Sequence, residues 1–272
     1  MKNLWNKKSF YRSFLLVIVS ILLCFTLACS GDFFASPSTS VPESLSPTPT
    51  ETPVFQTPNV PIIEDPNLVT LPRYSEQEVL DYFQEIAFSS EYEGDHPFIR
   101  RWDAPISYQI LGEFTLEDVD LLERLSARLN KIPGFPGIDA ASPSQEEVSI
   151  KITFAPMEDL GDLIDGYKEN NWGFCRVWAS DNVINRAEIV IACDEPDEEE
   201  RLSVVMEEFI QSLGLLQDSY HYPKSIFYQE WSLEQWPGLL DWTLVQMLYH
   251  PLLTCNMPMD AAMEILGAHL SQ

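Results

Sequence analysis

The sequence predicts an α+β domain, in which helices and strands occupy separate stretches of the chain. Apolar residues recur at helical spacing in two early segments, alternate in short strand-like segments, and return to helical spacing near the C-terminus. Successive runs of helices and strands of this kind are typical of α+β folds. The hydrophobic content of 45%, with 15 Phe and 7 Trp, is enough for one sizeable core.

Capping boxes mark the predicted starts of two helices in the first half. In residues 75–78 and 115–118 a Ser or Thr precedes an acidic residue by three positions, so each side chain satisfies a free backbone N–H of the first turn. We expect the first helix to run to about Phe88 and the second to end before residues 133–137, which are rich in Pro and Gly. Residues 106–111, between the two helices, alternate as a strand does.

Three further segments carry the residues that strands prefer. Residues 148–154 alternate in this way, and residues 174–178 and 187–192 flank the polar residues 180–182. A polar turn between two strand-like runs predicts a β-hairpin.

A further helix is predicted to begin at Asp197. Three consecutive glutamates follow it, in the first turn, where the helix dipole favours negative charge. Gly214 is expected to end the helix, because glycine readily adopts a left-handed conformation. Residues 239–249 and 260–270 are predicted to form two more helices, with another capping box at residues 232–235.

The charge of the chain restricts its partners. The 272 residues include 42 acidic and 16 basic side chains, for a net charge of -26. Such a surface repels phosphate backbones, which argues against nucleic acid as a partner. It equally disfavours contact between the folded domain and anionic lipids.

Residues 1–29 have the composition of a bacterial export signal. Basic residues, the last of them Arg12, precede an apolar run over residues 14–28, which is shorter than the ~20 residues of a membrane-spanning helix. The run ends in Ala28 and Cys29, which resemble a lipobox, although Thr26 departs from its usual aliphatic residue. We therefore predict a signal peptide and lipidation of Cys29. A simple cleaved signal and an uncleaved anchor are the alternatives.

The remaining chain divides into two parts, both expected to lie outside the cytoplasm. Residues 30–67 are rich in Ser, Thr and Pro, a composition that cannot bury a core and predicts a disordered tether. Residues 68–272 are expected to form the folded domain. The prediction is thus an exported domain anchored to the cell membrane by lipid.

Residues 204–218 combine the end of an amphipathic helix, a glycine stop and a polar turn. Their spacing resembles His-Glu-x-x-His-x-x-Gly-x-x-His-Asp, the zinc signature of metzincin peptidases. The residues that agree with the signature are Glu208, Gly214 and Asp218. The three histidine positions are occupied instead by Glu207, Gln211 and Gln217.

Two later segments resemble the same peptidases, especially the matrixin-like group. Residues 225–228, Ser-Ile-Phe-Tyr, are similar to the Ser-Ile-Met-x-Tyr of the Met-turn, with Phe227 at the Met position. Residues 233–249 are similar to the Leu-x-x-x-Asp…Leu-Tyr helix that follows, with a longer gap containing Pro237 and Gly238. The resemblance implies a zincin-like (metallopeptidase-like) domain, with a small mixed sheet, an active-site-type helix, a Met-turn-like segment and a C-terminal helix.

A closer resemblance covers residues 78–266. It is to an uncharacterised family of secreted and lipid-anchored bacterial domains of unknown function in the zincin-like superfamily, in which Glu-Glu-x-x-Gln replaces His-Glu-x-x-His. The segment that contains Arg101, Trp102 and Pro105 and residues 248–257 also carry this resemblance. It implies a degenerate active site and no particular reaction.

The residues at the histidine positions argue against zinc. Glu207 offers a carboxylate, whereas the neutral amides of Gln211 and Gln217 are poor zinc ligands. His221 could add one nitrogen, which still leaves the site short of ligands. We therefore predict neither zinc nor another cofactor.

Two functions of different classes remain. The first is a non-peptidase binding or structural module at the cell surface, with an extracellular protein or glycan as its ligand. The second is a hydrolase that uses Glu208 as general base, with Asp218 as a second candidate catalytic residue. Adjacent residues on a helix point about 100° apart, so Glu207 and Glu208 are not expected to act on the same substrate atom.

The cysteines of the domain permit at most one internal disulfide. Cys175 and Cys193 would tie the hairpin to the start of the following helix, and Cys193 with Cys255 is the rival pairing. A Cys–His nucleophile pair that uses His221 or His250 is also open. Outside the cytoplasm, however, these thiols are more prone to oxidation.

Substitution of the predicted lipidation site tests the membrane anchor. A Cys29→Ser variant should move from the membrane fraction to the soluble fraction, because the acyl chains that anchor the protein can no longer be attached. Fractionation and mass spectrometry of the N-terminus measure this, with Cys24→Ser as the control that should stay on the membrane. A Cys29→Ser protein that stays bound with its N-terminus intact would contradict the lipobox interpretation.

Overall fold

The computed structural model describes residues 74–91, 94–142, 145, 147–230, 232 and 234–270. The predicted signal peptide, Cys29, the tether and the start of the domain at residue 68 lie outside the described residues. Within them the chain forms an α+β domain around a five-stranded mixed sheet, so the predicted fold class is confirmed. None of the helices in these ranges is long and apolar enough to span a membrane.

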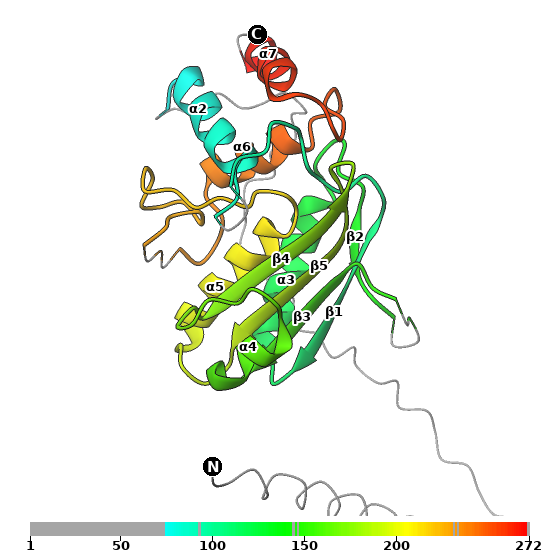
Figure 1. Cartoon of the computed structure of the whole chain (residues 1–272). Coiled ribbons are helices and arrows are strands. Elements are labelled where there is room, and N and C mark those ends of the chain that lie inside the picture. Colours follow the sequence, from blue (N-terminus) through cyan, green and yellow to red (C-terminus); the bar gives the residue numbers. More distant parts are fainter. Residues whose placement is uncertain are drawn as a thin grey trace, which may run out of the picture. The chain divides into compact units, whose positions relative to one another are not determined.

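The sheet has the strand order β2-β1-β3-β5-β4 (Figure 1). Its strands are β1 (Ile106–Gly112), β2 (Ile138–Ala140), β3 (Ile150–Ala155), β4 (Gly173–Ser180) and β5 (Val183–Ala192). The pairings are parallel except at the edge, where β4 runs antiparallel to β5. The predicted hairpin is therefore confirmed, and its turn residues Asp181 and Asn182 have φ of 52° and 60°, as a tight hairpin turn requires.

Two helices cover one face of the sheet, α3 (Leu116–Leu129) and α5 (Glu198–Gln211) (Figure 1). They contact each other, and α5 also packs on β4 and β5. Part of the opposite face is covered by α4 (Leu160–Leu163), which follows the short 3-10 helix Met157–Asp159. The sequence analysis missed β2 and these two short helices, because three or four residues are too few to show a periodicity.

A second group of helices lies at one end of the sheet (Figure 1). It comprises α2 (Glu76–Ala87), α6 (Leu239–Leu248) and α7 (Met259–Leu270), with α2 in contact with both others. The capping boxes predicted for α2 and α3 are present. The one predicted at residues 232–235 is wrong, because α6 begins only at Leu239, where the Asp241 carboxylate accepts the Gly238 N–H at 2.7 Å.

The irregular segment between α5 and α6 is held by a buried chain of hydrogen bonds. The Tyr82 hydroxyl of α2 donates to Ser225 Oγ at 2.9 Å, and Ser225 donates to Asp241 Oδ1 of α6 at 2.6 Å. Burial raises the pKa of Asp241 to about 7, although hydrogen bonds from Ser225 and from backbone N–H groups oppose the shift. This Tyr82–Ser225–Asp241 chain fixes the Ser-Ile-Phe-Tyr turn against two helices.

Gly214 ends α5 as predicted. Its φ is +117°, and its N–H donates to the Gln211 carbonyl at 2.9 Å. A Cβ at this position would lie 2.3 Å from the backbone oxygen of Arg100. Only glycine therefore allows the chain to turn here while the turn packs against the segment before β1.

A Gly214→Ala substitution should destabilise the domain by about 2 to 4 kcal/mol, because it combines a disfavoured left-handed backbone with a clash against backbone. Urea unfolding measures the loss. Gly94→Ala is the matched control, since Gly94 has φ +79° but no atom within 4 Å of the added Cβ. It should lose only about 1 kcal/mol, and equal losses in the two variants would show that the clash is relieved.

Candidate functional site

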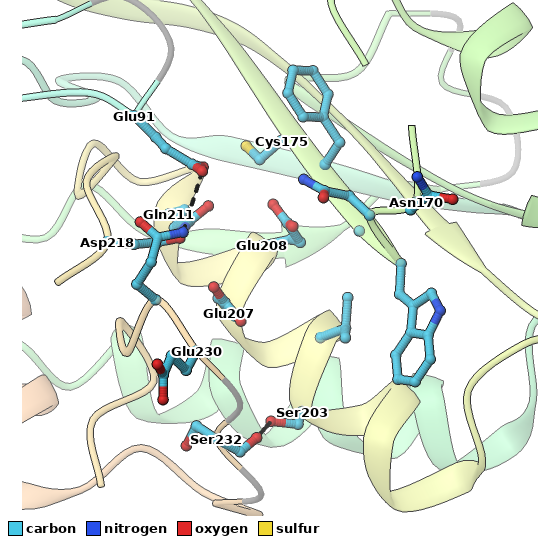
Figure 2. A pocket seen from close by; sticks show the side chains of 16 residues that line it. Glu91, Asn170, Cys175, Ser203, Glu207, Glu208, Gln211, Asp218, Glu230 and Ser232 are labelled. Carbon is cyan, nitrogen blue, oxygen red and sulfur yellow. Dashed lines mark hydrogen bonds between the residues drawn. The ribbon is translucent and has the colours of Figure 1, made fainter. Parts of the chain in front are cut away.

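An acidic cavity of about 390 Å³ lies between α5, the start of β4 and the irregular segment before α6 (Figure 2). We call it the acidic cavity. Its wall is formed by Glu91, Asn170, Asn171, Trp172, Gly173, Phe174, Cys175, Ser203, Val204, Glu207, Glu208, Gln211, Asp218, Gln229, Glu230 and Ser232. These residues come from four separate stretches of the chain, so the cavity exists only in the folded domain.

Helix α5 forms one wall of the cavity because its side chains three and four positions apart share a face. Val204, Glu207, Glu208 and Gln211 all lie in this wall. The sequence analysis expected Glu207 and Glu208 to diverge, yet both line the cavity. The reason is that the cavity extends around the helix, from β4 on one side to Glu230 on the other (Figure 2).

The carboxyl groups dominate the electrostatics of the cavity. Its wall contains Glu91, Glu207, Glu208, Asp218 and Glu230, and none of the lining residues is Lys, Arg or His. Burial, followed by repulsion from Asp218 and other carboxylates, raises the pKa of Glu207 and of Glu208 well above the usual value. Burial and the charge of Glu91 raise the pKa of Asp218 to about 7.

Glu208 is buried directly beneath the edge strand, with only 8% of its surface exposed. The backbone N–H of Cys175 in β4 donates to its carboxylate, which opposes the rise in its pKa. The neighbouring Gly173 makes this approach possible, since a Cβ there would lie 2.7 Å from Glu208 Oε1 and 2.4 Å from Val204 Cγ1. The absence of a side chain at Gly173 thus brings α5 against β4.

Hydrogen bonds fix the opposite side of the cavity. Gln211 Nε2 donates to Asp218 Oδ1 at 2.7 Å, which partly offsets the rise in the pKa of Asp218. Gln229 Nε2 donates to Glu91 Oε1 at 3.3 Å. These amides place two of the carboxylates without neutralising them.

The structure separates the predicted site residues into two groups. Glu207, Glu208, Gln211 and Asp218 meet in the cavity wall. Gln217 lies outside that wall, and its Nε2 donates to the backbone oxygen of Asp218 at 2.8 Å. His221 also lies outside it, with Nδ1 2.9 Å from Glu85 Oε2 on α2.

The donors in the cavity do not match a zincin metal site. The wall contains no imidazole, and its one thiol, Cys175, has a pKa raised by burial and by Glu208, which keeps it protonated. Among the described residues, no group of three or more His, Cys, Asp or Glu is placed to hold a metal ion. The expectation that the protein works without zinc stays a prediction.

Among the described residues, Cys175, Cys193 and Cys255 are free thiols. Cys175 lies opposite Ile189 in the β4–β5 ladder, and Ile189 is four residues before Cys193. At about 3.3 Å per residue this offset exceeds the ~7 Å limit for a disulfide. The expected Cys175–Cys193 disulfide is therefore wrong for this conformation, because the hairpin register moves the two residues apart.

A family model described as "Protein of unknown function (DUF2927)" matches residues 76–268. The chain belongs to this family. No curated protein matches the sequence. The match extends over α2 to α7, so the acidic cavity lies entirely within the DUF2927 domain, and the family description assigns no reaction to it.

Several residues of the DUF2927 cavity could not be found from the sequence. Glu91, Gln229 and Glu230 lie in segments with no motif, far from α5 along the chain. Asn170, with φ 73°, and Trp172 precede β4 without a helical or strand pattern. The available signal was Gly173, at the start of a predicted strand, where glycine often marks a close approach of another element.

The raised pKa of Asp218 predicts that the unliganded domain loses stability as pH rises. The folded form keeps the Asp218 proton up to about pH 7, whereas the unfolded chain releases it near 3.8, so stability falls between these values. An Asp218→Asn variant should therefore be more stable than wild type by about 1 to 3 kcal/mol at alkaline pH and nearly unchanged at acidic pH. Urea unfolding at the two pH values measures this.

Asp139→Asn is the control, because Asp139 is exposed on β2, away from the cavity. It should show no comparable gain. If Asp218→Asn were destabilising at alkaline pH, the fold would stabilise the ionised carboxylate of Asp218. The conclusion that this ionised group lowers the stability of the folded domain would then be wrong.

Proposed function

We propose that this DUF2927 domain is a non-peptidase binding module at the cell surface, whose acidic cavity receives a positively charged group of an extracellular protein or glycan ligand. The single observation that supports this is the set of five carboxyl groups in one cavity wall, with no basic residue among the residues that line the cavity. Crowded carboxylates that are short of counter-charge are either protonated or neutralised by a cation from outside.

The chemistry of the wall favours an amine or guanidinium over a metal ion. Carboxylates and amide oxygens accept hydrogen bonds from an ammonium group, and Glu208 and Asp218 lie on different sides of the cavity, so they can accept from one donor group together. Trp172 adds an aromatic surface, which attracts cations through its π face.

Export and anchoring are part of the same proposal. The basic, apolar and lipobox-like composition of residues 1–29 supports an exported chain that is lipid-anchored through Cys29. The Ser, Thr and Pro of residues 30–67 support a tether between membrane and domain. In this arrangement the domain faces away from the cytoplasm.

We also propose a zincin-like origin for the scaffold. A small mixed sheet, a helix with zincin spacing, a Ser-Ile-Phe-Tyr turn and a later helix follow in the order that the resemblance implies. The replaced histidine positions then account for the change from a metal site to an acidic cavity, because Glu207 and Gln211 still lie in the wall of that cavity.

A second candidate function is hydrolysis by acid–base catalysis. The observation that favours it is the shared rise in pKa of Glu207, Glu208 and Asp218, because a mixture of protonated and ionised carboxyls supplies an acid and a base near neutral pH. In this scheme Glu208 is the general base. Glu208→Gln should then abolish turnover of peptide or glycan libraries, and wild-type protein without turnover on either would leave the binding function alone.

Binding of a lysine derivative with one positive charge, Nα-acetyl-lysine amide, tests the proposed function. Its affinity for the full chain, measured by calorimetry at fixed salt, should rise through about pH 7, because Asp218 binds a cation only when ionised. Glu207→Gln and Glu208→Gln should each weaken binding by about tenfold, as expected for loss of a buried charge-assisted contact. The corresponding norleucine peptide, which lacks the ammonium group, should not bind.

Glu123→Gln is the matched control, since it removes the same charge from the exposed face of α3. An equal loss of affinity in this control would assign the binding to the overall negative charge rather than to the cavity. Absence of binding throughout would contradict the proposal, as would stoichiometric, tightly bound zinc in the purified protein.

A further inference from the structure

A second, smaller cavity of about 230 Å³ adjoins the acidic one along the edge of β4. Both cavities share Phe174 and Cys175. Across from the strand, Glu91 and Asp218 line the acidic cavity, whereas the nearby Ser90 and Leu216 line the smaller one. The two therefore follow one another along the same strand edge. We call the smaller one the basic end of the site.

The charge changes sign between the two cavities. The wall of the basic end contains Lys168 and Arg176, with Asp165 as its one acidic residue, whereas the acidic cavity has carboxyl groups without a basic residue. In a chain with 42 acidic and 16 basic residues, two cations beside an acidic cavity are not expected from composition. The arrangement is therefore dipolar along β4.

Arg176 is held so that its charge stays available. Its Nη1 donates to the backbone oxygen of Asp165 at 2.8 Å, and its guanidinium lies 5.1 Å from the centre of the Trp178 ring. Glu188, its cross-strand neighbour, lies within 4.0 Å of Arg186 instead. No ion pair of Arg176 is found among the described residues, so its guanidinium can donate to a carboxylate of the ligand.

Glu208 marks the other end of the site. It is more than nine-tenths buried, and the hydrogen bond from the Cys175 N–H serves one of its two oxygens. Among the described residues no second donor reaches this carboxyl group, which faces the acidic cavity (Figure 2). A buried carboxylate in this state gains from a cationic donor.

The strand gives the separation of the two backbone positions. Gly173, beside Glu208, and Arg176 are three residues apart on β4, which at about 3.3 Å per residue is on the order of 10 Å along the strand edge. Alternate residues face opposite sides of a strand, so Arg176 leaves β4 on the side of Phe174 and reaches the edge where its Nη1 contacts the Asp165 carbonyl. An extended peptide of three residues spans the same length. Phe174 and Cys175 provide an uncharged wall between the two ends.

We infer that the ligand of this site is a short zwitterion, with an ammonium group in the acidic cavity and a carboxylate on Arg176, about the length of an extended tripeptide. The inference rests on the proposed binding function. It adds to that function a negative charge on the ligand, bound by Arg176, and the length of the ligand. It assigns Arg176 as a ligand-binding residue that selects for a free carboxylate.

Four alanine peptides test the inference with the full chain by calorimetry. Trialanine carries both charges at the required spacing, its C-terminal amide keeps only the ammonium, its N-acetyl form keeps only the carboxylate, and dialanine is shorter. Trialanine should bind at least about fivefold more tightly than the amide, as one charge-assisted contact provides. Dialanine should bind more weakly than trialanine, and the N-acetyl form should not bind.

Arg176→Gln should make trialanine and its amide bind equally, and Arg176→Lys should restore part of the difference. Lys151→Gln is the control, because it removes one positive charge from an exposed residue of β3 that lines neither cavity, and it should leave the difference unchanged. Circular dichroism verifies that each variant is folded.

The outcomes separate the two proposals. If the amide bound as tightly as trialanine in the wild-type protein, the inference about Arg176 would be overturned while the acidic cavity would remain a cation site. An equal loss of selectivity in Lys151→Gln would also overturn it, because the effect would then come from surface charge. Failure of the amide and of the lysine probe together would overturn both proposals.

Discussion

The close approach of α5 to the edge strand β4 is the contact on which the site depends. Gly173 has no side chain, so Val204 and Glu208 of the helix pack against the strand where a Cβ would otherwise stand. This places a carboxylate under a backbone N–H of β4 and leaves the remainder of the α5 face open toward the segment before α6. Any larger residue at Gly173 would push the helix away and open the cavity to water.

The cavity is electrostatically unfavourable on its own, and this distinguishes it from the buried polar groups that only support the fold. Buried polar groups that only support a fold are normally paired. Arg201 and Asp118 follow this rule, since they form a buried ion pair at 3.1 Å between α5 and α3. Glu207, Glu208 and Asp218 lie on the same helix and the turn after it, and their pKa values are instead raised by burial and by nearby carboxylates. The domain thus neutralises its structural carboxylate and leaves those of the cavity without a basic partner.

The sequence was sufficient for the main elements and for part of the site. The boundaries of α2, α3 and α5 followed from local chemistry, because a capping box or a glycine at φ +117° acts within one turn. Glu207, Glu208, Gln211 and Asp218 were singled out by the resemblance of their spacing to a zinc-peptidase signature, and they do meet in one cavity.

The rest of the site depends on contacts that no local pattern encodes. Glu91 joins the cavity through a contact with Gln229, 138 positions away in the sequence. The capping box of α6 was misplaced for the same reason, since Asp241 caps its own helix while also accepting from Ser225 in the buried chain. The missing Cys175–Cys193 bond reflects a hairpin register that only the paired strands define.

The Tyr82–Ser225–Asp241 chain has a consequence for the order in which the domain can be completed. It joins α2 to a turn 143 positions later, and Arg101 likewise donates to the Leu248 and Leu253 carbonyls at separations of 147 and 152. Contacts between such distant positions form late, because a long loop must close first. The sheet can assemble from residues up to 192, but one side of the cavity acquires its shape only when nearly the whole chain has emerged. A nascent or truncated chain that ends before α6 would carry the scaffold and the residues of the acidic cavity, with one side of the cavity not yet fixed.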